Sequence, residues 1–300
     1  MANVTSAIYK NLLDSKTSGH AMANTSKEEY LDGVGGLRIF TRSWMPEGRP
    51  RGIIVLSHGF NSHSGYYLWA AQQLSGSGLA VYALDYRGRG KSDGERYYID
   101  SFAEYQGDLD MTVKLARSRD PGLPLFILGH SAGGVIACNY VLDHQSEIAG
   151  LICESFAYRV PAPDFALAVL KGLSHVAPHA HVLNLPKKEF SRDPKVTQAL
   201  IDDPLLANEV QPTKTVAEMV RADERLKRDF PQFRLPLLII HGTKDTVTRL
   251  EGSQEFYDRA SSADKTLKLY DGYFHDPLND IGKETVMTDI RAWIEKRLPV

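Results

Sequence analysis

The stretch Pro124–His144, PLFILGHSAGGVIACNYVLDH, determines how the rest of this sequence is interpreted. Its first residues are apolar throughout, which is typical of a strand buried on both faces of a sheet. The residues after the turn have the composition and length of a helix. Between the two lies Gly129-His130-Ser131-Ala132-Gly133. A strand, a tight turn and a helix in this order predict that Ser131 is held in a strained conformation, with its hydroxyl exposed at the carboxyl edge of the sheet.

Outward from this stretch, short apolar runs alternate with helical patterns. Strands that alternate with helices over short connections form largely parallel sheets, so the pattern predicts an α/β fold with helices on both faces. The predicted strands are Leu37–Trp44, Gly52–Ser57, Leu79–Leu84, Leu125–Leu128, Ile148–Cys153, Leu235–Ile240 and Thr266–Tyr270. The predicted core helices are Tyr66–Leu74, Phe102–Ser118, Val135–His144, Glu251–Ala260 and Lys283–Leu298.

One long gap interrupts this alternation, between Cys153 and Leu235. A structureless connection of that length is unusual in a compact domain. Prolines divide the gap into short pieces, and Asp164–Ser174 has the pattern of a helix that is apolar around most of its circumference. We therefore predict an α/β core made of residues 30–155 and 232–300, with a helical cap at residues 156–231. Residues 1–29 are polar and are expected to form a leader without chemistry of its own.

Composition excludes several classes of protein. The 300 residues are 43% hydrophobic and 24% charged, which is typical of a globular protein and not of a disordered or fibrous chain. A formal net charge of −2 provides no basic field for nucleic acid. Cys138 and Cys153 lie in apolar runs and are expected to be buried thiols. No apolar run has the length of a signal peptide or a membrane span, so we expect a cytoplasmic protein.

A serine hydroxyl is a weak nucleophile near neutral pH. If Ser131 is a nucleophile, it needs a histidine to accept its proton and a carboxylate to orient that histidine. When a serine lies in a strand–turn–helix elbow of this kind, the acid and then the histidine come later in the chain. Asp245 follows the predicted strand Leu235–Ile240, and His275 follows the predicted strand Thr266–Tyr270. We therefore predict Ser131, Asp245 and His275 as the catalytic residues, meeting at one edge of the sheet.

The same hypothesis requires backbone donors for a developing oxyanion. The donors are expected to be the N–H of the residue after the serine, Ala132, and the N–H of Phe60, which follows the strand Gly52–Ser57. Glu154 is a competing acid, because it ends the strand before the gap.

Other groups are expected to serve structural roles. His58 and His241 each precede a glycine at a strand end and are expected to brace loops. His175, His179 and His181 lack a partnering carboxylate or cysteine, so no metal site is predicted. The GKS at residues 90–92 lacks the first glycine of a phosphate-binding loop, so no nucleotide cofactor is predicted.

At these residues the chain resembles the α/β-hydrolase superfamily, and within it the monoacylglycerol lipase and lysophospholipase-like serine hydrolases. The resemblance covers about residues 36–298 and lies in LSHGF, LDYRGRGKSDG, LGHSAGG, DDPL, HGTKDTV and DGYFHDPLND. It implies a sheet of about eight strands, a cap after strand six, a triad of Ser131, Asp245 and His275, and no cofactor. Ala132 stands where family members often have methionine, and Asp276 and Asp280 where they often have glutamates. These differences leave the preferred acyl chain open.

The leading functional hypothesis is a serine esterase or lipase that works through an acyl-enzyme on a small ester or lipid-like substrate. The same triad also supports lactonase, perhydrolase, peptidase and acyltransferase chemistry. A non-catalytic receptor built on this fold is the alternative from another class, and the retention of all three candidate residues disfavours it. Asp164–Ser174 has more apolar side chains than packing one face of the helix on the sheet would use. This predicts that the cap lines an acyl pocket or touches a lipid surface.

Overall fold

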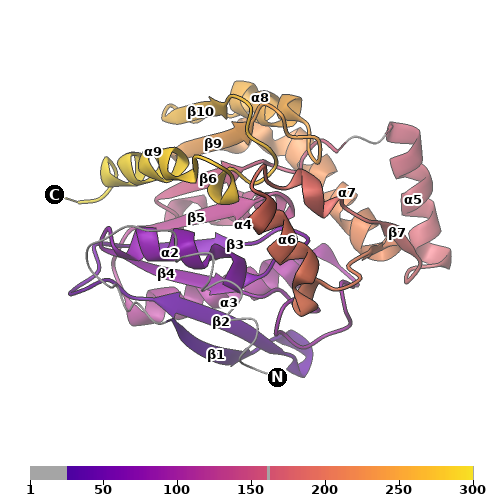
Figure 1. Cartoon of the computed structure of the whole chain (residues 1–300), viewed down its shortest axis with the longest axis horizontal. Helices are drawn as coiled ribbons and strands as arrows, with labels where there is room; N and C mark the ends of the chain where they lie inside the picture. The colour runs from indigo at the N-terminus through magenta and orange to yellow at the C-terminus, as the bar shows by residue number, and fades with distance from the viewer. Residues whose placement is uncertain (1–25, 161–162, 300) are drawn as a thin grey trace.

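The computed structural model describes residues 26–160 and 163–299 of the chain. Eight strands form one sheet in the spatial order β1-β2-β4-β3-β5-β6-β9-β10 (Figure 1). Strand β2 is antiparallel to both neighbours, and all other neighbours pair in parallel. The predicted mostly parallel α/β sheet is confirmed. The strands are β1 Lys27–Asp32, β2 Arg38–Trp44, β3 Gly52–Ser57, β4 Leu79–Leu84, β5 Leu125–His130, β6 Gly150–Glu154, β9 Leu237–Gly242 and β10 Lys265–Tyr270.

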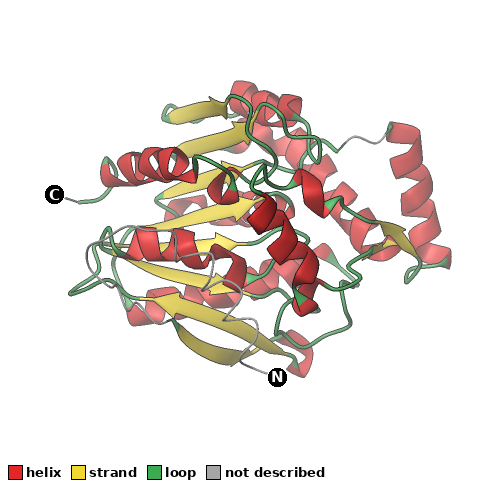
Figure 2. Ribbon diagram, viewed as in Figure 1, coloured by secondary structure: helices red, strands yellow, loops and turns green. Residues whose placement is uncertain are grey.

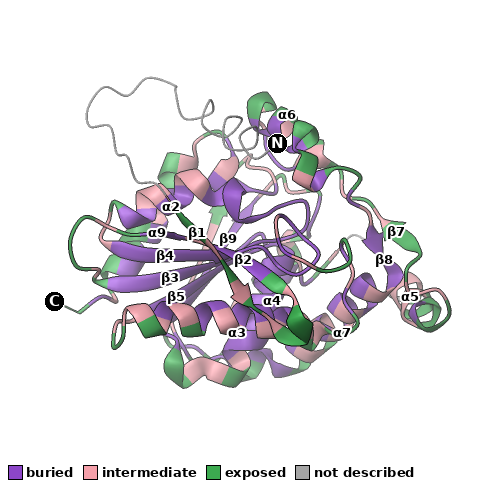
Figure 3. Cartoon of the chain, turned by 90° about the horizontal axis from the view of Figure 1, so that it is seen from below, coloured by how far each residue is buried: buried purple, intermediate pink, exposed green. Residues whose placement is uncertain are grey.

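Helices cover both faces of this sheet, as Figures 2 and 3 show. Alternate side chains of the central strands enter two separate apolar cores, because successive residues of a strand point to opposite faces. One core is covered by α3, α4 and α8, and the other by α2 and α9. These helices are α2 Leu68–Ser75, α3 Phe102–Arg119, α4 Ala132–His144, α8 Leu250–Arg259 and α9 Lys283–Glu295.

The strand β1 was not predicted, and it changes one predicted boundary. Residues 1–25 of the predicted leader lie outside the described residues, but its last residues belong to Lys27–Asp32. This strand lies at the edge of the sheet, and its sequence KEEYLD has no apolar run. It is held by its antiparallel pairing with β2 and by ion pairs such as Glu29 with Arg119. An exposed edge strand does not need apolar residues, so its pattern gives little signal.

The predicted insertion lies between β6 and β9, at the carboxyl edge of the sheet (Figure 1). It contains α5 Asp164–Val176, β7 His181–Leu183, α6 Pro194–Asp202, β8 Gln211–Pro212 and α7 Thr213–Asp229. Helix α5 packs on α7, and α7 in turn packs on α4 of the core. Helix α6 instead adds to the apolar core beneath α2 and α9. The insertion is therefore anchored to both faces of the sheet.

Two smaller expectations can be compared with the structure. Cys138 in α4 and Cys153 in β6 are buried free thiols, as predicted, with their sulfur atoms 3.4 Å apart. In the described part of the chain, no helix is both long enough and apolar enough to cross a membrane.

Candidate active site

The turn between β5 and α4 is as tight as its sequence predicts. Ser131 has a φ of 53° and a ψ of −121°, a region that residues with a side chain rarely adopt. A Cβ at Gly133 would lie 2.1 Å from the carbonyl oxygen of Ser57, and one at Gly129 would lie 2.7 Å from the carbonyl oxygen of Gly133. Glycine is therefore required at both positions. The Ser131 N–H donates to the carbonyl of Glu154 at 2.9 Å, which ties the turn to β6.

The structure brings His275 onto this serine. The Nε2 atom of His275 lies 2.9 Å from Ser131 Oγ, and its Nδ1 atom lies 2.8 Å from Asp245 Oδ2. The three side chains thus form one continuous hydrogen-bonded line across residues that are far apart in the sequence. The ring of Phe190, from the insertion, packs edge-on against the His275 ring at 4.9 Å between centroids. No sequence motif pointed to Phe190, because it has no chemistry of its own.

Asp245 sits in a shell of donors that stabilises its ionised form. Its Oδ1 accepts the N–H groups of Val247 and Thr248 at 2.8 and 3.0 Å, and its Oδ2 accepts the Thr248 hydroxyl at 2.7 Å. The Nε2 atom of His241 lies 3.1 Å from the same Oδ2. Burial alone would raise the pKa of Asp245, but His275, His241 and the hydrogen bonds hold it well below its usual range. His241 therefore lies beside Asp245, closer to the candidate triad than its expected loop-bracing role implied.

Glu154, the competing acid, lies in a different environment. Its Oε1 accepts the N–H of Leu278 at 2.7 Å, in the segment after His275. Burial and then the neighbouring Asp276 raise the pKa of Glu154 well above its usual range. A buried carboxyl that keeps its proton is poorly suited to stabilise an imidazolium. The geometry therefore joins Asp245, and not Glu154, to His275.

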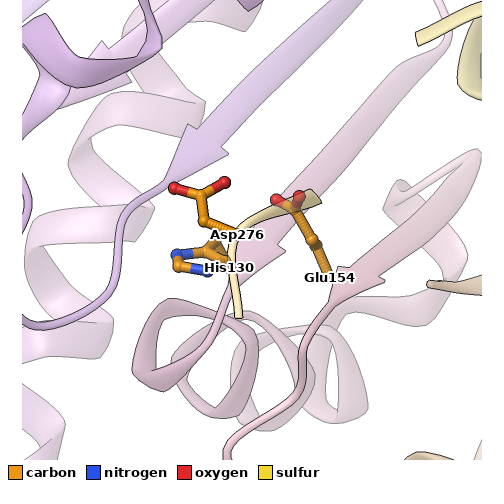
Figure 4. A group of neighbouring side chains, drawn as sticks. All are labelled: His130, Glu154 and Asp276. Carbon is orange, nitrogen blue, oxygen red and sulfur yellow. The ribbon is translucent and has the colours of Figure 1, made fainter. Parts of the chain in front are cut away.

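Glu154 belongs to a buried polar cluster with His130 and Asp276 (Figure 4). One potential ligand atom from each residue lies within 4.8 Å of the other two. Among the described residues, Glu154 Oε2, Asp276 Oδ1 and His130 Nδ1 are buried atoms without a hydrogen-bond partner. Burial lowers the pKa of His130 to about 3, so its imidazole is neutral. Burial also raises the pKa of Asp276 to about 6. The donor types would suit a metal ion, and binding one would require Glu154 to lose the proton that burial favours.

The loop after β3 approaches the serine closely. A Cβ at Gly59 would lie 2.9 Å from the Cβ of Ser131, so only glycine allows this approach. Phe60 and Ala132, the two predicted oxyanion donors, are both buried beside this contact. His58 braces the loop as expected: its Nδ1 lies 2.7 Å from the carbonyl of Gly59, and its Nε2 accepts the N–H of Tyr86. Burial lowers the pKa of His58 to about 4, consistent with a neutral ring in these two bonds.

The remaining sequence candidates do not converge on the site. His175 lies near Arg221, and His179 pairs with Glu95 and stacks on Tyr98. His181 begins the short strand β7.

A cavity of about 530 Å³ lies between α5, α7 and the loop after β6. Leu167, Val220 and Asp223 are among the residues that line it, whereas Ser131, Asp245 and His275 are not.

The sheet order, the insertion after β6 and the serine elbow define an α/β-hydrolase. Residues 48–282 match the family described as serine aminopeptidase, S33, and the chain belongs to this family. Its curated relatives include monoacylglycerol lipase of Mycolicibacterium smegmatis, 34% identical over 92% of this chain and 100% of the relative. Human monoglyceride lipase is 31% identical over 89% of this chain and 90% of the relative.

Among solved structures, a soluble variant of monoglyceride lipase from Saccharomyces cerevisiae, in complex with a substrate analog, has the same fold. The TM-score is 0.84 at 24% identity, over 95% of this chain and 99% of that one. Together with the family match and the relatives, the fold identifies the protein as a lipase-like serine hydrolase that acts on carboxylic esters.

The raised pKa of Asp276 predicts a pH-dependent cost to folding. Its pKa is about 6 in the folded protein against 3.8 for the free side chain, so the folded state binds more protons between pH 4 and 6. Stability therefore falls as the pH rises through this window. Relative to Asp276→Asn, the wild type should lose about 2 kcal/mol of unfolding free energy between pH 4 and pH 7. Urea unfolding of both proteins across this range measures the difference, and parallel profiles would contradict the prediction.

Proposed function

We propose that Ser131, His275 and Asp245 form the catalytic triad of this ester hydrolase. The observation that supports the assignment best is the hydrogen-bonded line from Ser131 Oγ through both ring nitrogens of His275 to Asp245 Oδ2. Asp245 accepts a hydrogen bond from the N–H at Nδ1 of His275, which leaves the lone pair of Nε2 facing the serine. His275 can then take the proton of the serine hydroxyl.

The reaction proceeds in two halves. Ser131 Oγ attacks the ester carbonyl carbon while its proton passes to His275 Nε2, and the N–H groups of Phe60 and Ala132 donate to the resulting oxyanion. Collapse of the tetrahedral intermediate breaks the ester bond, and His275 gives its proton to the departing alcohol. In the second half, His275 takes a proton from water as the water attacks the acyl-enzyme. The acid product leaves and Ser131 regains its proton.

We further propose that residues 156–231 act as a cap, or lid, over a core of residues 30–155 and 232–300. Contacts between the insertion and the proposed catalytic loop support this role. The Asp276 N–H donates to the carbonyl of Phe190 at 2.9 Å, and the Phe190 ring lies on His275. Ser131 is only 4% exposed, and we propose that substrate reaches it by passing beneath the cap.

The outer face of α5 suits transient contact with a lipid surface. Four apolar side chains that recur at helical spacing are exposed, with 74% of Phe165, 67% of Val169, 41% of Leu173 and 85% of Val176 accessible. Figure 3 shows α5 at the far end of the cap, away from the sheet. Apolar residues gathered on one face of a surface helix favour partition into a lipid interface. We propose a monoacylglycerol or lysophospholipid as the substrate, delivered from such an interface, and a cytoplasmic location.

A peptidase is the second candidate, because the matching family is described as serine aminopeptidase. The same triad can attack an amide, so the assignment depends on the leaving group. Hydrolysis of aminoacyl p-nitroanilides at rates above those of p-nitrophenyl esters would favour it over the esterase.

Ser131→Ala and His275→Ala should each remove nearly all turnover of p-nitrophenyl butyrate. The nucleophile and its base act as one unit, so the double variant should lose little more than either single variant. A fluorophosphonate probe should label the wild type and not Ser131→Ala. Near-wild-type kcat in folded His275→Ala would disprove the assignment of the base.

The two buried acids should differ sharply in their effect on kcat. Asp245→Asn should lower kcat on the order of 10⁴-fold, the loss seen in the best-known serine triad, because it favours the wrong histidine tautomer. Glu154→Gln should lower kcat far less, since Glu154 contacts Leu278 and not the imidazole. Steady-state kinetics of the two folded variants provide the comparison. The reverse ranking would transfer the role of the acid to Glu154.

Charged substitutions on the outer face of α5 should affect lipid substrates alone. Val169→Asp should lower kcat/KM for a monoacylglycerol in vesicles about tenfold, because a buried apolar side chain contributes roughly 1.5–3 kcal/mol. Turnover of soluble p-nitrophenyl acetate should stay unchanged. Val34→Asp, at an equally exposed apolar position outside the cap, is the matched control. Equal losses in both variants would mean that α5 has no special contact with the interface.

A further inference from the structure

A carboxylate from the cap reaches the loop that carries a proposed oxyanion donor. The Oε1 atom of Glu209 accepts the backbone N–H of Asn61 at 2.9 Å. Asn61 follows Phe60 directly, and Glu209 comes just before β8 in the cap. Both residues are almost fully buried. The peptide between Phe60 and Asn61 is therefore oriented by a group that the core does not supply.

The backbone at Asn61 is left-handed, with a φ of 51°. Asparagine adopts this region more readily than most residues, and contacts with the cap hold it there. A second cap group also contacts this residue, since Asn61 Nδ2 donates to the carbonyl of Leu185 at 3.4 Å. The conformation of the loop thus depends on two contacts with the cap.

Arg89 completes the restraint from the core side. Its guanidinium lies over the Phe60 ring, 4.2 Å from the centroid, and donates to Glu209 Oε1 and to Gln211 Oε1. The side chains of Arg89 and Glu209 are 2% and 1% exposed, so the ion pair is fully desolvated. Arg89 balances the charge of Glu209. The carboxylate can therefore hold the loop without repelling the oxyanion that forms beside Phe60. Phe60 is held through its ring on one side and through its following peptide on the other.

We propose that Glu209 is a positioning residue for the oxyanion loop. Its hydrogen bond to Asn61 fixes the orientation in which the Phe60 N–H faces the tetrahedral oxygen, so the oxyanion hole is complete only when the cap is seated. The proposal rests on the proposed function of Phe60 as a donor. In this proposal the inner side of the cap takes part in the chemical step. The outer face of α5 has a different role, which is contact with lipid.

The test compares two double variants that differ only in the acceptor for the Asn61 N–H. Removing Glu209 alone would leave Arg89 buried and unpaired, which destabilises folds strongly. Arg89→Met with Glu209→Gln removes both charges and keeps a carbonyl oxygen in reach of Asn61. Arg89→Met with Glu209→Met removes both charges and the acceptor. Thermal melts establish the temperature at which both variants and the wild type are folded.

The readout is the hydrolysis of p-nitrophenyl acetate, whose short acyl group makes little demand on the cap. The double variant with Glu209→Met should have a kcat at least tenfold below that of the double variant with Glu209→Gln, because small displacements of a catalytic group lower the rate by up to about 10²-fold. The KM values of the two should agree within about twofold. Inhibition by a boronic acid, which forms a tetrahedral adduct on Ser131, should weaken in parallel. Equal kcat values, or a change in KM alone, would overturn the proposal.

Asp108→Asn is the control for a purely structural effect. It removes the carboxylate of another buried ion pair, between Arg87 in the loop after β4 and Asp108 in α3. This variant should lose thermal stability and keep its kcat. A tenfold loss of kcat here would show that any damage to these loops slows the reaction, which would overturn the specific role of Glu209. Failure of the proposed function is recognised separately, because Ser131→Ala would then retain turnover whatever the Glu209 variants do.

Discussion

The close approach of three backbone segments beneath Ser131 is the constraint on which the site depends. Strand β5 turns into α4 within one residue, and this turn presses on the end of β3 so tightly that a Cβ at Gly133 would lie 2.1 Å from the Ser57 carbonyl oxygen, well inside van der Waals contact. Packing of this density leaves the serine a single backbone conformation. The hydroxyl consequently has a fixed position, and loops from the other strand ends can be arranged around it.

The buried edge of the sheet holds carboxyl groups in opposite protonation states. Asp245 is surrounded by N–H groups, a hydroxyl and two imidazoles, and these keep it ionised. Glu154 and Asp276 face each other and a neutral His130, so burial favours their protons. Hydrogen-bond donors decide the difference, because all of these carboxyl groups are desolvated. The fold thus joins an ionised acid to His275 and keeps Glu154, whose pKa is raised, out of hydrogen-bond contact with it.

Much of the fold was predictable because its signals are local. Seven of the eight strands were predicted, five of them from runs that are buried along their whole length, and the glycines around Ser131 mark a turn that few other residues could form. The edge strand Lys27–Asp32 was missed because four of its six residues are exposed and none is buried, so it needs no apolar pattern. Phe190 and Glu209 were missed for another reason. Each is an ordinary residue in its own segment and matters only through a partner more than eighty residues away.

The sequence by itself determined the elbow, the alternation of strands and helices, the insertion after β6 and the chain order of serine, acid and histidine. Each of these follows from short-range sterics or from periodic burial, which neighbouring residues encode. Only the tertiary structure decided which carboxyl lies against His275, how the insertion after β6 contacts the loop after Phe60, and which face of α5 remains in solvent. Those outcomes depend on distances between segments that are remote in the chain. Such distances are set by the packing of the whole molecule and not by any local pattern.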